Sequence, residues 1–203
     1  MATSAGSILA TFIFLIAAPD ESWSQSVVVL LESAMLGVAL WASGLGMARP
    51  ALVLFAFGMA VAAAELAGGG RTVTGLVGLL DFALAVATVV VIGLGVVDQR
   101  EINRQSISGA ICIYLLLGIL FTFLFGAIAE LGSGDFFAQG TDGTPSLRIY
   151  FSYVTLATLG YGDYTAAGEL GRSMAIAEAG QLYLVTVVAL LVGHFGQRRR
   201  DRA

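Results

Sequence analysis

Long apolar stretches with almost no charge are the feature that most constrains this chain. A helix of about 20 mostly apolar residues is needed to cross a bilayer, and the chain offers five such stretches. Only 12% of its 203 residues are charged, whereas a soluble domain carries about 25%. We therefore predict an all-α integral membrane protein with spans at 26–47, 50–68, 75–97, 107–130 and 173–195.

A shorter apolar stretch at residues 8–18 ends at Pro19. It fits either a sixth span or a signal-like segment. No basic residue precedes it, which argues against a secretory signal. Under either interpretation the next span starts outside, so the remaining topology is unchanged.

The placement of arginines predicts the orientation, because all ten basic residues are arginines and basic residues concentrate on the cytoplasmic side. If the span 26–47 starts outside, seven arginines are cytoplasmic (Arg49, Arg100, Arg104, Arg198, Arg199, Arg200 and Arg202) and three are outside (Arg71, Arg148 and Arg172). We expect a multi-pass protein of the cell membrane with a cytoplasmic C-terminus. The lysine-free composition, rich in glycine, alanine and arginine, suggests a bacterial inner membrane.

This topology divides the chain into four parts. Residues 1–97 form an N-terminal bundle of about four helices, 98–106 a cytoplasmic linker, 107–197 a second module and 198–203 a short basic tail. We expect the tail arginines to anchor the chain at lipid headgroups, with regulation by anionic lipids as the alternative.

A polar segment separates the last two spans. Within it, residues 146–159 are apolar and aromatic, but a helix of this length would measure only about 21 Å, too short to span. Pro145 ahead of it is typical of a helix start. We predict a re-entrant half-helix that returns as an extended segment, which is tolerated at that depth only where it is buried in protein or lines water.

The extended segment would be Thr158–Gly162, TLGYG. Its glycines permit φ > 0, and alternating backbone handedness can turn successive carbonyls to one side. Four such segments around one axis would build stacked rings of oxygens that replace the hydration shell of a cation. One copy cannot close a ring, so we expect a homotetramer. The partly negative C-terminal end of each half-helix would favour cations.

Together with Asp163, this motif and its context of span, half-helix and span resemble the potassium-channel family, whose filter reads Thr-Val-Gly-Tyr-Gly-Asp. The resemblance covers about residues 107–197. It implies passive K+ conduction through rings of carbonyl oxygens, the mechanism described for that family. The implied K+ ligands are Thr158, Leu159, Gly160 and Tyr161, with Gly162 permitting the outer turn.

The resemblance also implies supporting positions around this filter. Asp163 would lie at the outer mouth, either bonding behind the filter or concentrating cations, and Thr155 matches another family threonine. Tyr161 would point away from the pore and pack against pore-helix aromatics, for which Tyr150 and Phe151 are suitably placed.

Three positions depart from the family pattern. Leu159 replaces the usual valine, Ala157 stands where many members have threonine, and Val154 stands where some carry a glutamate paired with the filter aspartate. These differences bear on conductance and filter inactivation more than on the preference for K+.

The span 173–195 would be the inner helix of the pore. Gly180 and Gly193 are candidate gate hinges, although small residues also serve close helix packing in membranes. Glu178 is the one acid in this span. We expect it to be a partner for pore-helix hydroxyls rather than an ion site.

Four helices before a pore module are the layout of voltage-gated channels, but the charges are missing. The span 75–97 has no arginine and its one charge is Asp81, so we do not expect strong voltage sensing through this helix. We predict instead a polar cluster near the outer face, formed by Glu32, Glu65 and Asp81 with Arg71 as its cation. The alternative is a set of acids that are merely hydrogen-bonded near the interface.

These patterns predict a potassium-selective channel without an intrinsic voltage sensor. The alternatives are a non-selective cation channel and a subunit of a pore-loop cation transporter, a class that normally carries four pore modules on one chain. We do not expect an enzyme, because Cys112 and His194 supply neither a nucleophile–base pair nor a set of metal ligands. We expect no cofactor apart from K+ as the permeant ion, and no nucleic-acid partner.

Overall fold

The computed structural model describes residues 70–97 and 104–178, together with short helical pieces at 13–14, 27–31, 33–34 and 36–37. Several predictions concern residues outside these ranges: the span 50–68, the acids Glu32 and Glu65, the glycines Gly180 and Gly193, and the basic tail.

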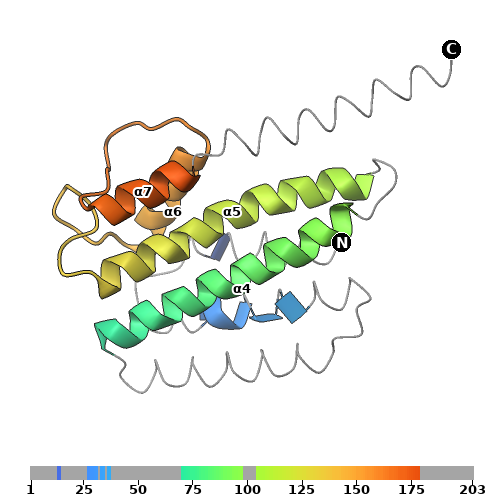
Figure 1. Ribbon diagram of the computed structural model, residues 1–203, viewed down its shortest axis with the longest axis horizontal. Helices are drawn as coiled ribbons and strands as arrows, with labels where there is room; N and C mark the ends of the chain where they lie inside the picture. The colour runs from blue at the N-terminus through green and yellow to red at the C-terminus, as the bar shows by residue number, and fades with distance from the viewer. Residues whose placement is uncertain are drawn as a thin grey trace, which may run out of the picture.

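The described helices, labelled as in Figure 1, are α4 (Arg71–Val97), α5 (Arg104–Leu131), α6 (Pro145–Leu156) and α7 (Glu169–Glu178). α4 and α5 lie side by side and run in opposite directions (Figure 1). By length and composition, the segments Arg71–Leu94 and Gly109–Leu131 could each cross a membrane. Both helices begin a few residues before the predicted spans, because apolar length marks the part suited to lipid and not the end of the helix.

Apolar side chains and a glycine build the interface between α4 and α5. Ala85 of α4 shares a buried cluster with Leu116 and Ile119 of α5. Nearer the outer end, a Cβ added at Gly78 would lie 3.4 Å from the backbone nitrogen of Ala127. Small residues let helix backbones approach closely in membranes, and Gly78 does so here.

The short N-terminal pieces pack on the same pair of helices. Val28 joins the cluster between α4 and α5, and Leu36 packs with Leu84 of α4. Ser33, between them in sequence, is also buried. The described part of the predicted span 26–47 is therefore helical and rests on α4.

An aromatic cluster holds α6 against the C-terminal part of α5 and the loop that follows it. Phe125 of α5 and Phe151 of α6 lie with ring centroids 5.2 Å apart. Phe137 of the loop lies 4.8 Å from Phe136 and 5.3 Å from Phe151. All four rings are buried, and ring pairs of this geometry add about 0.5–1.5 kcal/mol each beyond their buried area.

The loop between α5 and α6 also pairs with the chain that precedes α7. The N–H of Ala138 donates to the carbonyl oxygen of Thr165, and the N–H of Ala167 donates to that of Phe136, both at 2.8 Å. These bonds fix the segment that leads from the TLGYG motif into α7.

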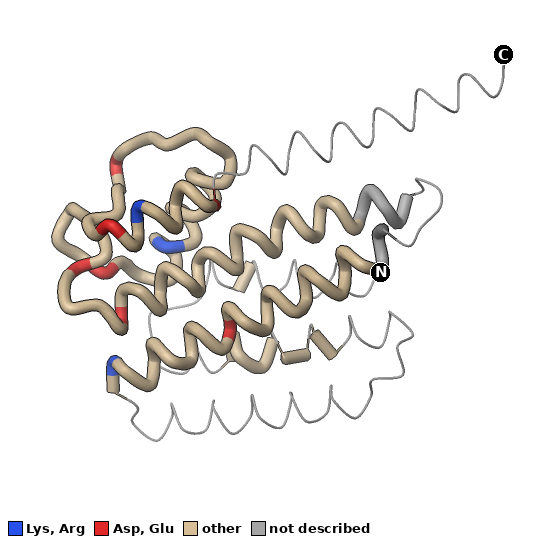
Figure 2. The backbone as a smooth tube through the Cα atoms, viewed as in Figure 1, with Lys and Arg blue, Asp and Glu red and all other residues tan. Residues whose placement is uncertain are grey.

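Most charged side chains gather at one end of the described fold (Figure 2). α5 carries none from Gly109 to Ala129, and α4 carries only Asp81 beyond its first residue, Arg71. Asp81 is buried. Helices whose middle lies in hydrocarbon have this distribution of charge.

Candidate functional site

Local chemistry fixes the start of α6. Thr144 is extended at φ −79° and ψ 163°, and its side chain accepts a hydrogen bond from the N–H of Leu147 at 3.1 Å. Pro145 occupies the first turn, where its missing N–H is not needed. The start predicted at this proline is confirmed, and the 12-residue helix is only about 18 Å long.

The end of α6 comes earlier than predicted, at Leu156 rather than residue 159. Thr158 adopts φ +58°, in the left-handed region. Its N–H donates to Thr155 O at 2.9 Å, and the N–H of Leu159 donates to Val154 O at 3.0 Å. Such a bond pair is a Schellman motif, which closes a helix and usually has glycine at the left-handed position. A β-branched residue there is strained by about 1–3 kcal/mol.

The sign of φ then alternates along the TLGYG segment. Thr158, Gly160 and Gly162 have φ of 58°, 52° and 79°, whereas Leu159 and Tyr161 between them do not have positive φ. A Cβ added at either glycine would meet no atom within 4 Å. The backbone conformation, and not lack of space, therefore favours glycine. The positive φ expected at both glycines is confirmed.

Peptide geometry sets the direction of the first carbonyls in this segment. The N–H groups of Leu159 and Gly160 both donate to Val154 O of α6, at 3.0 and 3.4 Å. In a planar trans peptide the N–H points opposite to the carbonyl of the preceding residue, and the described chain has no cis peptide. The carbonyls of Thr158 and Leu159 therefore both point away from α6.

The electrostatics at this helix end favour a cation. α6 has no basic residue in its last turn. The partly negative C-terminal end of the helix, equivalent to about half a charge, is thus not offset by a side chain of that turn. The TLGYG segment begins at that end.

Two side chains hold the outer end of the segment. The Tyr150 phenol donates to Asp163 Oδ2 at 2.7 Å, and this hydrogen bond raises the pKa of Tyr150 to about 12. Gln139 of the preceding loop donates from Nε2 to Asp163 O at 2.9 Å and accepts from Thr165 N–H at 3.3 Å. Of the two positions expected for Asp163, the described chain has the one bonded to the half-helix.

Within one chain, Phe151 and Tyr161 do not contact each other, and the predicted packing of Tyr161 on half-helix aromatics stays a prediction for an assembly of several chains. Phe151 is buried in the aromatic cluster around Phe137, whereas Tyr161 is 66% exposed and makes no ring contact within the described residues. Tyr150 and Phe151 are adjacent on one helix, so their side chains lie about 100° apart around its axis. Tyr150 faces the TLGYG segment and contributes its hydroxyl to Asp163 at its end, and Phe151 faces the cluster.

A buried carboxyl lies behind the half-helix. Glu178 of α7 is 3% exposed and is hydrogen-bonded to the Ser152 hydroxyl of α6. The same hydroxyl oxygen lies 2.7 Å from the carbonyl oxygen of Gly118 in α5. The expectation that Glu178 is a partner for a pore-helix hydroxyl is confirmed.

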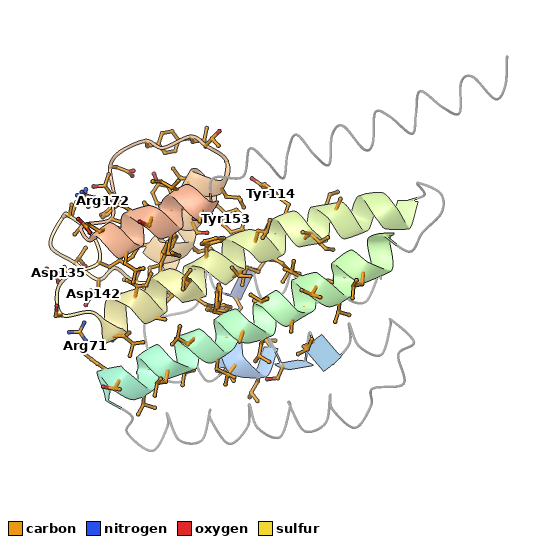
Figure 3. All side chains as sticks on the ribbon, in the orientation of Figure 1. Arg71, Tyr114, Asp135, Asp142, Tyr153 and Arg172 are labelled. Carbon is orange, nitrogen blue, oxygen red and sulfur yellow. The ribbon has the colours of Figure 1, made fainter. Side chains whose placement is uncertain are left out.

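The neighbouring Tyr153 anchors α6 on α5. Its hydroxyl donates to Leu115 O at 2.5 Å, and its ring meets Tyr114 edge-on with centroids 6.5 Å apart (Figure 3). The ring also fills the space that a Cβ on Gly118 would need. A glycine at this position of α5 is therefore required by the close approach of Tyr153.

Arg71 has partners that the sequence analysis did not foresee. Its Nη2 donates to Asp142 Oδ2 at 2.8 Å and to Ala129 O at 3.1 Å, and its Nε lies 3.5 Å from Glu130 Oε2 (Figure 3). Asp81 lies ten residues further along α4, about 15 Å away by helical rise. The arginine therefore joins the N-terminal end of α4 and the C-terminal end of α5 to the loop before α6.

Comparison with known proteins finds a family that is similar to these elements. Residues 109–197 match the ion channel family. The similarity to an ion channel pore domain covers this part of the chain. The family is one of channels and not of enzymes. The order of α5, the short α6 and α7 is consistent with the outer, half and inner helices of such a domain.

The chain is also similar to a potassium channel. The inward rectifier potassium channel Kirbac3.1 of Paramagnetospirillum magnetotacticum is 30% identical over 104 residues. The match covers 50% of this chain and 35% of the relative, so this chain spans about a third of the curated protein it matches. No solved structure matches the chain.

Some residues around the pore domain were missed by sequence reasoning. Gln139 carries no motif, and only its bond to Asp163 identifies it. Glu130 and Asp142 could have been found, because the arginine topology places both outside with Arg71. Among the described residues, no group of three or more His, Cys, Asp or Glu side chains could hold a metal ion.

Proposed function

We propose that this chain is one subunit of a homotetrameric, potassium-selective channel of the cell membrane, which conducts K+ passively through the TLGYG segment. The observation that carries the proposal is the alternating sign of φ from Thr158 to Gly162, directly after a capped half-helix. Rings of carbonyl oxygens from such a segment can replace the hydration shell of K+. Similarity to a potassium channel supports the choice of ion.

The first two proposed ligand rings follow from the peptide directions. The carbonyls of Thr158 and Leu159 point away from α6, to the side where three further copies would complete each ring. The proposed ligands above them are the carbonyls of Gly160 and Tyr161. Leu159 contributes only its carbonyl, so its larger side chain leaves the ligand set unchanged.

The proposed tetramer would cover apolar surface that one chain leaves exposed. Leu159 and Tyr161 of the filter segment and Ile176 of α7 are exposed by 58%, 66% and 77%. Large apolar side chains this exposed beside a functional segment favour an interface with another protein surface. A second copy of the chain is the proposed occupant.

Gating in this proposal does not use a voltage sensor of arginines. The one arginine of α4, Arg71, lies at its first residue and pairs with Asp142 outside the apolar part of the helix. The inner-helix glycines Gly180 and Gly193 are proposed as hinges. A polar cluster of Glu32, Glu65 and Asp81, and anionic lipids at the tail arginines, are proposed modulators.

The test is the reversal potential of purified protein in planar bilayers under opposing K+ and Na+ gradients. We expect a value near the K+ equilibrium potential. Gly160→Ala should move it toward zero, because alanine is strained at φ +52°. Gly168→Ala is the matched control, since Gly168 has open space and no positive φ.

The outcomes separate the candidate functions. A reversal potential near zero in the unmodified channel, with substantial current, would mean a non-selective cation channel. Selectivity that survives Gly160→Ala would contradict the assignment of the filter. A complex other than a tetramer by native mass spectrometry would contradict the proposed assembly.

A further inference from the structure

The Ser152 hydroxyl lies between two oxygens from two other helices. One is the carbonyl oxygen of Gly118 in α5, at 2.7 Å, and the other is Oε1 of Glu178 in α7. A serine hydroxyl has one proton to donate, and a carbonyl oxygen can only accept. If Ser152 donates to Gly118, the short contact with Glu178 is a hydrogen bond only when the carboxyl carries a proton.

The surroundings of Glu178 favour the same state. The residue is 3% exposed, and its second oxygen, Oε2, has no hydrogen-bond partner among the described residues. An ionised carboxylate here would leave a buried charge with an unpartnered oxygen, which is far less favourable than a neutral acid whose carbonyl is unpaired.

We propose that Glu178 is held as a neutral carboxylic acid that donates its proton to Ser152, while the Ser152 hydroxyl donates its own proton to Gly118 O, so that two hydrogen bonds in series join α5, α6 and α7 behind the filter. This inference rests on the proposed function only for its effect on conduction. Glu178 acts as a positioning residue, since Ser152 lies in the half-helix whose end begins the TLGYG segment. The carboxyl itself does not touch the ion path.

Loss of this proton would rearrange the contact. An ionised Glu178 can only accept, so the Ser152 hydroxyl would turn to it and release the Gly118 carbonyl. The other titratable and charged side chains described on these helices are Cys112, Tyr114 and Glu130 of α5, Arg148, Tyr150 and Tyr153 of α6, and Glu169 and Arg172 of α7. Arg148 and Glu130 lie 4.0 Å apart, and Tyr150 is hydrogen-bonded to Asp163. Conduction should therefore fall as alkaline pH removes the proton.

Infrared spectroscopy of the full chain in lipid vesicles tests the protonation directly. We expect a carbonyl band of a protonated carboxylic acid at neutral pH, absent in Glu178→Gln. The band should persist in Glu169→Gln, the matched control, because Glu169 is an exposed acid on the same helix. Ser152→Ala should keep the band but shift its frequency, because the acid loses its hydrogen-bond partner.

Ion flux from the same vesicles tests the effect on the filter. Glu178→Gln should keep the flux at neutral pH within about twofold, since an amide still donates to Ser152. In Glu178→Gln the flux should no longer fall at alkaline pH. In Glu169→Gln the flux should still fall. A purely structural role would not change this pH profile.

Each result decides the inference. Identical spectra for the parent protein and Glu178→Gln would overturn it, because Glu178 would then be ionised. If Glu178→Gln does not assemble, the Ser152→Ala frequency shift still decides, and an unshifted band would overturn the proposed contact. The infrared result does not need conduction, so a channel that proves non-selective would leave this inference standing.

Discussion

The phenol of Tyr150 donates a 2.7 Å hydrogen bond to the carboxylate of Asp163, so that two residues 13 positions apart close a loop around the entire TLGYG segment. Tyr150 lies one helical turn before Val154, on the half-helix that leads into the segment. The bond ties the outer end of the segment to the helix that fixes its inner end. The strained segment is thereby fixed at both of its ends.

Replacing Tyr150 by phenylalanine should loosen the outer end of the filter. The substitution keeps the ring and removes the donor, so Asp163 loses its bond to the half-helix. We expect the proposed tetramer to stay intact. Its K+ current should decline several-fold faster during sustained recording than in the parent protein, because a charge-assisted hydrogen bond is lost. Single-channel recordings in planar bilayers measure this. Gln139→Leu, which removes the bond to the Asp163 backbone, provides a comparison, and an unchanged decline in Tyr150→Phe would contradict the argument.

The same bond predicts a late tyrosine titration. The pKa of Tyr150 is raised from 10.0 to about 12, and the hydrogen bond to Asp163 is the largest cause. A raised pKa means that the neutral phenol is the stabilised form, so the bond is fully present below about pH 10 and is lost as pH rises through about 12. The tyrosinate absorbance of the parent protein minus that of Tyr150→Phe should rise only in that window. A difference curve centred near pH 10 would mean that the bond is not made in solution.

Replacing Thr158 by glycine should increase the stability of the protein and reduce its K+ selectivity. Its φ of +58° is strained for a β-branched residue, and relief of that strain by Thr158→Gly should exceed the entropic loss, for a net gain of about 1 kcal/mol. The same change removes the Thr158 hydroxyl, which we propose as a further K+ ligand beside the Thr158 carbonyl, so K+ selectivity should fall. Thermal unfolding and reversal potentials measure the two effects.

Thr158→Ser is the control for the hydroxyl. It should retain most of the selectivity while it relieves only part of the strain, because serine is not β-branched. Equal loss of selectivity in the serine and glycine variants would show that the hydroxyl is not a ligand.

The positions of the helices were predictable from the sequence, but the end of the half-helix and the partners of many side chains were not. Apolar length was enough to place α4 and α5, and Pro145 was enough to place the start of the half-helix. The end at Leu156 was not predictable, because it depends on Thr158 in a left-handed conformation that its residue type disfavours. The backbone hydrogen bonds that Thr158 and Leu159 make back to α6 accompany that conformation.

Side-chain partners were predicted least well. Tyr150 was predicted as a packing partner for Tyr161, and its hydrogen bond to Asp163 within the same chain was not predicted. Arg71 was expected to pair with acids of the N-terminal bundle. Its described partners lie instead on α5 and on the loop between α5 and α6. Such contacts depend on how helices rotate against each other, which a pattern along one chain does not specify.

The ion pair between Arg71 and Asp142 should couple the start of α4 to the loop before α6 only weakly. The Arg71 side chain is 61% exposed, and the pair is 2.8 Å apart. Exposed pairs contribute about 0.2–1 kcal/mol and are screened by salt. A double-mutant cycle with Arg71→Gln and Asp142→Asn, followed by thermal unfolding at low and high salt, should give a coupling in this range that shrinks with salt. Additive effects of the two substitutions would mean that the pair contributes nothing.

Glycines on the two long helices should respond in opposite directions to the same small change. At Gly118 a Cβ would overlap the Tyr153 ring, which is also held by its 2.5 Å bond to Leu115 O. Gly118→Ala should therefore destabilise the protein by about 1–3 kcal/mol, as overpacking does. At Gly93 a Cβ would meet nothing within 4 Å, so Gly93→Ala should stabilise by about 0.5–1 kcal/mol through helix propensity alone. Thermal unfolding of both variants in the same detergent measures the difference in their stabilities. Equal losses of stability in Gly93→Ala and Gly118→Ala would mean that Tyr153 does not pack against α5 as described.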